Sequence, residues 1–125
     1  MRYLLDSHVF LWYDEGGPQL KDIYRAMLDD PENELFLSVA SLWELSVKRS
    51  IGRLERSSSF YVAAQRLGIQ VISVTAEHAE AIESLPRHHG DPFDHMLIAQ
   101  VRLEDLILVT HDEAMTRYSV PTLRV

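Results

Sequence analysis

Two short apolar runs, one near each end of the chain, stop abruptly before a carboxylate. Tyr3–Leu5 is followed by Asp6, and Leu106–Val109 is followed within three residues by Asp112. Continuous apolar runs of this length, bounded by polar residues, are typical of strands buried on both faces of a parallel sheet. Sites in open α/β sheets collect at the carboxyl ends of the strands. We therefore expect both carboxylates at that edge of the sheet.

Strand and helix patterns alternate along the rest of the sequence. Further strands are expected at Glu34–Leu37, Ile69–Val74 and Thr122–Val125. Helices, bounded by capping and breaking residues, are expected at 7–13, 18–29, 39–51, 60–67, 76–85, 92–103 and 112–118. This alternation predicts an α/β fold, in which right-handed crossovers join a parallel sheet flanked by helices. The 125 residues are expected to form a single domain, residues 1–125.

The composition restricts the class of protein. No apolar run approaches the roughly 20 residues that a membrane-spanning helix needs, and no signal peptide is visible. The absence of cysteine excludes disulfides and thiolate metal sites, and it fits a cytoplasmic protein. The net charge of −7 argues against broad binding to phosphate backbones, unless the acidic side chains are gathered at a metal site.

A third carboxylate is expected on the buried side of the helix that follows the second strand. With Ser38 as N-cap, a helical-wheel projection places Glu44 among the apolar residues of one face. That face comprises Ala40, Trp43, Val47 and Ile51. A buried carboxylate needs a partner because its desolvation is costly. The alternative is a capping box from Ser41 to Glu44, which starts the helix three residues later.

The stretch Asp91–Asp94 opens the clearest helix of the chain. Asp91 suits the N-cap, Pro92 suits the first helical position, and Asp94 falls at the third. Asp91 is therefore expected mainly as a cap. Asp94 either complements the positive end of the helix dipole or joins the other carboxylates at the sheet edge.

Four carboxylates thus stand out by position: Asp6, Glu44, Asp94 and Asp112. Asp6 and Asp112 have the simpler alternative of capping the helices that follow them. If the four converge, their mutual repulsion requires a counter-charge. Ligation by oxygen alone favours Mg²⁺ or Mn²⁺, which commonly serve phosphoryl transfer. The nearby His8, His95 and His111 lack a zinc-binding spacing, so we expect them to bond phosphate or carboxylate groups instead.

The stretches that carry these acids resemble the PIN-domain ribonucleases, and in particular the VapC-like toxins of bacterial toxin–antitoxin pairs. They are Tyr3–His8, Ser38–Leu45, Asp91–Gln100 and Leu108–Asp112, in the order of the family. The resemblance implies a three-layer α/β/α sandwich with a central, mainly parallel sheet of four to five strands. It also implies a Mg²⁺- or Mn²⁺-dependent endoribonuclease, a toxin that inhibits translation or growth.

Site residues and partners follow from the same resemblance. The acidic quartet of the family, catalytic and metal-binding, corresponds to Asp6, Glu44, Asp94 and Asp112. Thr110 matches a hydroxyl position that supports the metal site, and Asp91 and Ser7 are further supporting candidates. The implied partners are an RNA substrate, a cognate antitoxin and a second copy of the chain, with no membrane.

Two basic rims are candidate RNA contacts, although each also fits an ordinary solvated surface. One comprises Lys48, Arg49, Arg53 and Arg56, and the other comprises Arg87, His88 and His89.

Two other functions remain open at this point. One is a non-catalytic PIN-like module that binds RNA or protein. The other is a phosphoacceptor domain of the receiver type, which needs an early pair of acids, an acceptor Asp after a central strand and a late lysine. Asp6 has no acidic neighbour, and no lysine follows Lys48, so the receiver reading fits less well.

Overall fold

A computed structural model describes residues 1–125, in which five parallel strands form one sheet in the order β3-β2-β1-β4-β5. The strands are β1 (Arg2–Leu5), β2 (Glu34–Ser38), β3 (Gln70–Ile72), β4 (Ile107–Thr110) and β5 (Thr122–Arg124). The helices are α1 (Ser7–Glu15), α2 (Asp22–Asp29), α3 (Val39–Ser50), α4 (Phe60–Arg66), α5 (Ala76–Ala81) and α6 (Pro92–Glu104), with 3₁₀ turns η1 (Ile82–Ser84) and η2 (Glu113–Arg117).

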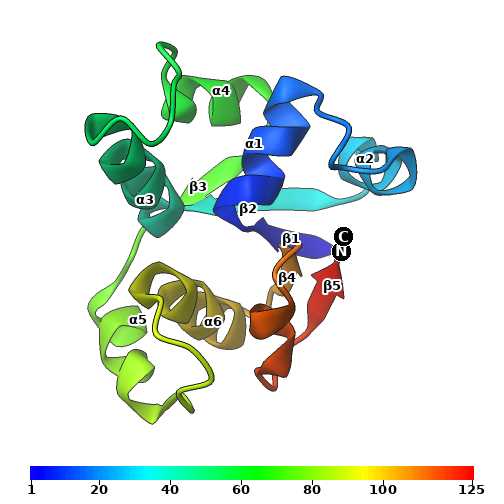
Figure 1. The fold of residues 1–125 in the computed structure, drawn as a ribbon. Helices are drawn as coiled ribbons and strands as arrows, with labels where there is room; N and C mark the ends of the chain where they lie inside the picture. Colours follow the sequence, from blue (N-terminus) through cyan, green and yellow to red (C-terminus); the bar gives the residue numbers. More distant parts are fainter.

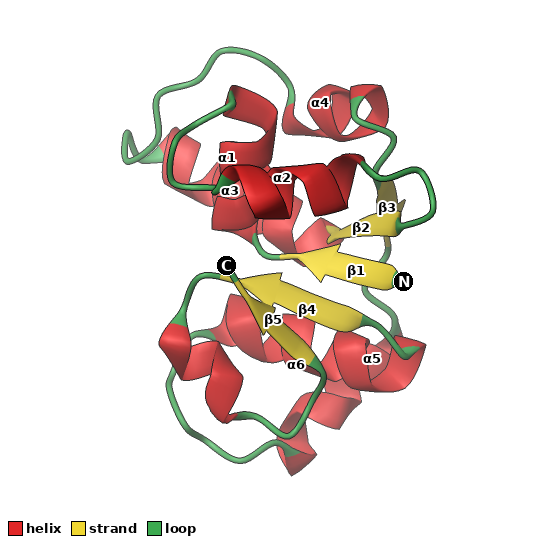
Figure 2. Cartoon of the chain, turned by 90° about the vertical axis from the view of Figure 1, so that its right-hand side faces the viewer, coloured by secondary structure: helices red, strands yellow, loops and turns green.

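Helices cover both faces of this sheet. Figure 1 and Figure 2 show α1 to α4 on one side and α5, α6 and η2 on the other. The strands bury alternate side chains into the two layers: Leu5 belongs to the core under α1 and α4, and Leu4 to the core under α6. The predicted three-layer α/β/α sandwich with a parallel sheet is confirmed.

The strand order creates a switch point between β1 and β4. The connection from β1 to β2 passes through α1 and α2 on one face, and the connection from β3 to β4 passes through α5 and α6 on the other. At such a point the two connections diverge and leave a crevice beyond the carboxyl ends of the strands. Asp6 lies there, because its N–H continues the β1–β4 pairing by donating to the Val109 carbonyl over 3.0 Å.

Helix α3 begins as predicted but turns a different side to the core. Ser38 is the N-cap, and its Oγ accepts the Ala40 N–H at 3.0 Å. This excludes the alternative capping box that starts the helix at Ser41. The predicted apolar face is wrong, because Trp43 is 64% exposed and Ile51 is 61% exposed.

The buried side of α3 is the one that faces the sheet and its neighbours α1 and α6. It comprises Ala40, Ser41, Glu44 and Leu45. Glu44 is therefore buried as expected, but beside Leu45 and not beside Trp43. The helical-wheel prediction assumed that the largest apolar side chains face the core. In the folded protein, the position of the neighbouring elements determines which side of the helix is buried.

The exposed apolar residues of α3 form one wall of a groove of about 370 Å³. This apolar groove is lined by Val39, Ala40, Trp43, Val74, Ile82, Pro92, Phe93 and Met96. The Trp43 and Phe93 rings meet edge to face across it, with centroids 5.1 Å apart.

Most of the remaining differences from expectation lie at the ends of elements: α2 begins at Asp22 instead of Pro18, β3 is shorter than the strand expected at 69–74, and the predicted helix 76–85 ends in the turn η1. The segment expected as a helix at 112–118 forms the 3₁₀ turn η2. None of the helices has both the length and the apolar composition required to cross a bilayer.

Candidate functional site

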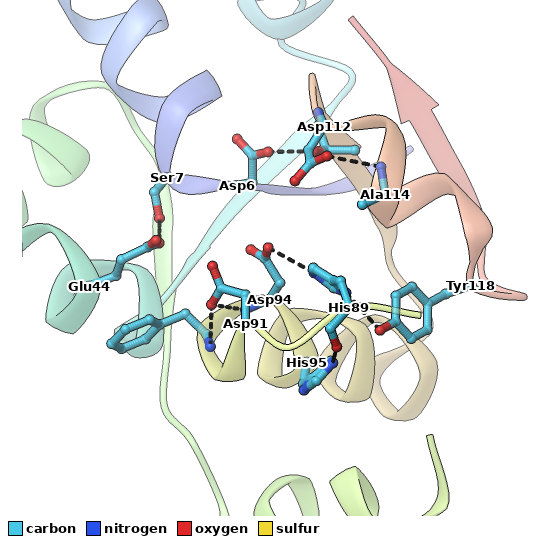
Figure 3. Close-up of polar contacts among 12 residues, drawn as sticks. Asp6, Ser7, Glu44, His89, Asp91, Asp94, His95, Asp112, Ala114 and Tyr118 are labelled. Carbon is cyan, nitrogen blue, oxygen red and sulfur yellow. Dashed lines mark hydrogen bonds and ion pairs between the residues drawn. The ribbon is translucent and has the colours of Figure 1, made fainter. Parts of the chain in front are cut away.

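A pocket of about 100 Å³ opens at the switch point and contains no hydrophobic residue. This acidic pocket is lined by Asp6, Ser7, His8, Glu44, Lys48, Asp91, Asp94 and Asp112. Its residues come from the end of β1, from the start of α1, from α3, from the start of α6 and from the segment after β4 (Figure 3). The structure thus brings the predicted acidic quartet to one pocket, together with Asp91 and Ser7.

Asp6 is the most deeply buried of these carboxylates, with 7% of its surface exposed. It caps α1, since its Oδ1 accepts the Val9 N–H at 2.8 Å, and its Oδ2 accepts the Thr110 hydroxyl. Burial raises the pKa of Asp6, although both hydrogen bonds oppose that shift. Capping and membership of the pocket are therefore compatible roles for this side chain.

Thr110 connects the two strand-end acids. Its hydroxyl donates to Asp6 and accepts the Asp112 N–H at 3.0 Å. Asp112 in turn caps η2, because its Oδ1 accepts the Ala114 N–H at 2.9 Å. One buried hydroxyl thereby fixes the backbone at Asp112 relative to the Asp6 carboxylate.

Glu44 reaches the pocket from α3 and is held at both oxygens. Oε1 accepts a short hydrogen bond from the Ser7 hydroxyl, and Oε2 lies 3.1 Å from the Lys48 Nζ, one helical turn along. These are the partners that a buried carboxylate requires. Lys48, a candidate RNA contact, is thus also a counter-charge inside the acidic pocket.

Asp91 and Asp94 sit in the first turn of α6. Asp91 is the N-cap, with its Oδ1 accepting the N–H groups of Phe93 at 2.9 Å and Asp94 at 3.3 Å. The Asp94 Oδ2 lies 3.0 Å from the His89 Nε2. Burial, together with the charges of Asp91 and Glu44, raises the pKa of Asp94 to about 7, against the opposing effect of His89.

The donor chemistry of the pocket fits a hard divalent cation. Its carboxylates supply only oxygen ligands, and burial, with a contribution from neighbouring carboxylates, raises the pKa of Asp6 and Asp94, so a cation would stabilise their ionised forms. Each carboxylate is nevertheless turned towards a partner within the protein. In this arrangement no three carboxylate or histidine side chains stand close enough to share a metal ion.

The basic residues of the first rim differ in their surroundings. Arg53 lines a second pocket, of about 240 Å³, that shares His8 and Lys48 with the acidic pocket. Arg49 donates to the carbonyls of Arg56 and Ser58, and therefore braces the loop after α3.

The remaining basic candidates are Arg56 of the first rim and the residues of the second rim. Arg56 pairs with Asp14 at 2.6 Å, which directs it away from the acidic pocket. Arg87 and His88 are exposed on the loop before α6.

Two histidines next to the acids bond backbone groups where a carboxylate or phosphate was expected. The His95 Nε2 lies 2.7 Å from the His89 carbonyl, and the His111 Nδ1 lies 2.6 Å from the Val125 carbonyl. His8 is exposed beside the acidic pocket, with its ring centroid 6.1 Å from that of Trp12.

Sequence reasoning missed the connection of His89 and Tyr118 to the site. The His89 Nδ1 lies 2.9 Å from the Tyr118 hydroxyl, while its Nε2 contacts Asp94. The pair is 29 residues apart in the sequence, and no periodic pattern relates them. Only the folded arrangement of the loop before α6 reveals the contact.

The protein is thus a parallel α/β domain with a carboxylate-lined pocket at the switch point of its sheet. The chain belongs to the PIN domain family, whose profile matches residues 3–121. No protein among curated sequences matches the chain.

Several solved structures share the fold. A chain of VapBC2 from Rickettsia felis, bound to a DNA fragment from its promoter, is 14% identical, with a TM-score of 0.74 over 99% of this chain and 98% of that one. A chain of DNA-bound VapBC from Salmonella typhimurium is 13% identical, with a TM-score of 0.67 over 99% and 98%. A chain of VapBC-1 from nontypeable Haemophilus influenzae is 15% identical, with a TM-score of 0.61 over 99% and 98%.

Proposed function

We propose that this PIN-domain protein is a Mg²⁺- or Mn²⁺-dependent endoribonuclease that acts as the toxin of a toxin–antitoxin pair. The observation that carries the proposal is the convergence of Asp6, Glu44, Asp94 and Asp112 on one pocket at the switch point of the sheet. Four carboxylates gathered in one pocket repel one another, and a bound cation would offset that repulsion.

In this proposal the four carboxylates hold the cation, and neighbouring side chains hold the carboxylates. Ser7 and Lys48 fix Glu44, and Thr110 fixes Asp6 relative to the turn that carries Asp112. When bound, Mg²⁺ or Mn²⁺ activates water for attack on the phosphodiester and neutralises charge on the phosphate oxygens. No side chain of the chain acts as a covalent nucleophile.

The protonation of Asp94 links this site to pH. With a pKa of about 7, its carboxyl group is half protonated near neutral pH in the metal-free protein. The proton relieves repulsion from Asp91 and Glu44. Since metal ligands bind in their deprotonated form, loading the site releases this proton, and affinity for the cation rises with pH.

An RNA strand reaches the site, in this proposal, along the surface that carries Lys48 and Arg53. The pocket beside Arg53 adjoins the acidic pocket through His8 and Lys48. A positive charge there favours the phosphates on either side of the scissile bond. Arg87 and His88, on the opposite loop, are candidate contacts for the other end of the strand.

The receiver-type alternative is disfavoured by topology. Receiver domains have the strand order 2-1-3-4-5, whereas this sheet has the order 3-2-1-4-5. The third strand, β3, lies at the edge and carries no acid at its end. A non-catalytic PIN-like module that binds RNA or protein remains the second candidate, because the carboxylates are separately hydrogen-bonded in this arrangement.

The toxin assignment includes an antitoxin partner, a homodimer and a cytoplasmic location, where RNA is available as substrate. Support comes from the neighbours in fold, which are VapBC assemblies from several bacteria. The exposed apolar groove also supports association, since large exposed apolar patches commonly mark protein contacts.

The test is incubation of the purified protein with total RNA in Mg²⁺, in Mn²⁺ and in EDTA, followed by mapping of the new RNA ends. The proposal predicts a small set of internal cleavage sites that require the metal. Metal-dependent binding of RNA without new ends would instead favour the non-catalytic module. Growth arrest on expression of the chain, relieved by the product of an adjoining gene, tests the toxin assignment separately.

A further inference from the structure

We propose that His89 and Tyr118 form a brace that orients the Asp94 carboxylate for metal binding. The inference rests on the proposed metal site and adds two positioning residues to it. In Figure 3 the carboxylate of Asp94 points into the space below Asp6 and Asp112, with the His89 ring at its side. Oδ2 is engaged by the His89 Nε2 at 3.0 Å, and no hydrogen bond within the protein engages Oδ1.

Two contacts orient the His89 ring. Asp94 binds a metal as an ionised carboxylate, which only accepts hydrogen bonds, so in that form the His89 Nε2 carries a proton and donates to Asp94. The His89 Nδ1 lies 2.9 Å from the Tyr118 hydroxyl, which can donate a hydrogen bond or accept one. Tyr118 therefore holds the ring in the orientation from which Nε2 reaches Asp94.

Buried groups hold the brace in place. Tyr118 is 3% exposed and His95 is 5% exposed, and the His95 Nε2 donates to the His89 carbonyl over 2.7 Å. The Tyr118 ring also packs edge-on against the rings of His89 and His95, with centroids 5.6 Å and 6.1 Å away. The loop is thus anchored through both the ring and the backbone carbonyl of His89.

The brace also joins two parts of the acidic pocket. Asp112 caps η2, and Tyr118 is the residue at which η2 ends. The contact from Tyr118 through His89 to Asp94 therefore ties the segment that carries Asp112 to the first turn of α6. A ligand carboxylate that is already oriented loses less freedom when it binds an ion, and such outer contacts typically change metal affinity by about 10- to 100-fold.

The alternative roles of His89 differ in their consequences. Both ring nitrogens are engaged within the protein, so the ring has no free nitrogen for an RNA phosphate. A purely structural role in the loop would change stability and leave the affinity for metal as it was. Metal affinity is therefore the decisive quantity.

The experiment measures Mn²⁺ binding by calorimetry in the wild type and in Tyr118→Phe, His89→Ala and His89→Gln. Tyr118→Phe removes one hydroxyl, and His89→Ala removes both contacts; we expect each to weaken Mn²⁺ binding about 10- to 100-fold. His89→Gln keeps an amide donor for Asp94 and is expected to recover most of the affinity. Tyr61→Phe, on the exposed side of α4, is the matched control and should bind Mn²⁺ like the wild type.

A second readout follows the two contacts of the His89 ring directly. In the Mg²⁺-loaded protein the ¹⁵N chemical shifts of His89 should show a protonated Nε2 in the wild type, and the Nδ1 shift should change in Tyr118→Phe. If Tyr118→Phe and His89→Ala are folded and bind Mn²⁺ within twofold of the wild type, the brace is overturned while the nuclease proposal stands. If the wild type binds Mn²⁺, the variants bind it weakly and no RNA is cleaved, the brace stands and the nuclease proposal fails.

Discussion

Two neighbouring surfaces share the helices α3 and α6 and differ completely in chemistry. Glu44 and Asp94 line the acidic pocket, whereas Trp43 and Phe93, the residues directly before them, line the apolar groove. A step of one residue along a helix rotates the side chain by about 100°, which is enough to reach the other surface. The same two turns of helix therefore build both features.

The two surfaces are incomplete in different ways. In the acidic pocket the carboxylates have partners within the chain, yet burial and the charges of Asp91 and Glu44 raise the pKa of Asp94 to about 7, against the opposing effect of His89. In the apolar groove Trp43 packs against the Phe93 ring and is still 64% exposed. A cation would therefore stabilise the pocket and an apolar partner would stabilise the groove, and the two can be tested separately.

The largest expected effect concerns the charge in the pocket. Asp6→Asn and Asp94→Asn should each reduce metal-dependent RNA cleavage to the background of the assay. Asparagine keeps the shape of both side chains, and at position 6 it can still cap α1, so the fold should persist while the negative charge is lost. Asp22→Asn, an exposed change on α2, is the matched control and should leave cleavage unchanged. Wild-type rates in either pocket variant would contradict the metal-site assignment.

The next effect separates the two sides of α3. Leu45→Ala should lower the free energy of unfolding by about 2–5 kcal/mol, because Leu45 is 1% exposed and its loss leaves a cavity. Trp43→Ser should change it by no more than about 0.5 kcal/mol, since this ring packs mainly at the surface. Urea denaturation measures both. An equal loss in the two variants would mean that the groove is part of the core.

These two residues also show how far sequence reasoning reaches. The strands were predictable because buried parallel strands read as continuous apolar runs, as in Leu106–Val109. The buried side of α3 was not predictable, because the spacing of apolar residues along the helix is the same whether Trp43 is exposed or lies in the core. Which side is covered depends on α1 and α6, whose positions are fixed only by the complete fold.

The candidate site divides in the same way. The positions of Asp6 and Asp112 followed from the rule that parallel strands bring their carboxyl ends to one edge. The partners of the carboxylates did not follow, because the Ser7–Glu44 and Tyr118–His89 contacts join distant segments. The sequence patterns therefore predicted which acids form the site, whereas the side chains that hydrogen-bond them could be identified only from the three-dimensional structure.

The pH dependence of stability tests the raised pKa of Asp94. The pKa of Asp94 is raised above its unfolded value, so the folded protein retains a proton that the unfolded chain has already lost. The stability of the metal-free protein should therefore fall as the pH rises from about 4 to about 7, by at most about 1.4 kcal/mol per pH unit for this group. Thermal unfolding in EDTA across this range, with Asp94→Asn as reference, measures the difference. If stability changed with pH equally in the wild type and in Asp94→Asn, the raised pKa of Asp94 would be contradicted.

The smallest expected effect concerns the hydroxyl that connects Asp6 to Asp112. Thr110→Val keeps the shape of the side chain and removes both hydrogen bonds, so Mn²⁺ affinity should fall about 10- to 100-fold while the sheet is retained. Thr116→Val, an exposed change in η2, is the control. Calorimetric titration with Mn²⁺ distinguishes the two, and identical affinities would limit Thr110 to a structural role.

The most direct test of the central claim is anomalous diffraction from a crystal soaked in Mn²⁺. The account predicts a manganese peak in the acidic pocket, within coordination distance of oxygens from Asp6, Asp94 and at least one of Glu44 and Asp112. Clear density for these side chains without a manganese peak between them, or a peak bound only elsewhere on the molecule, would contradict it.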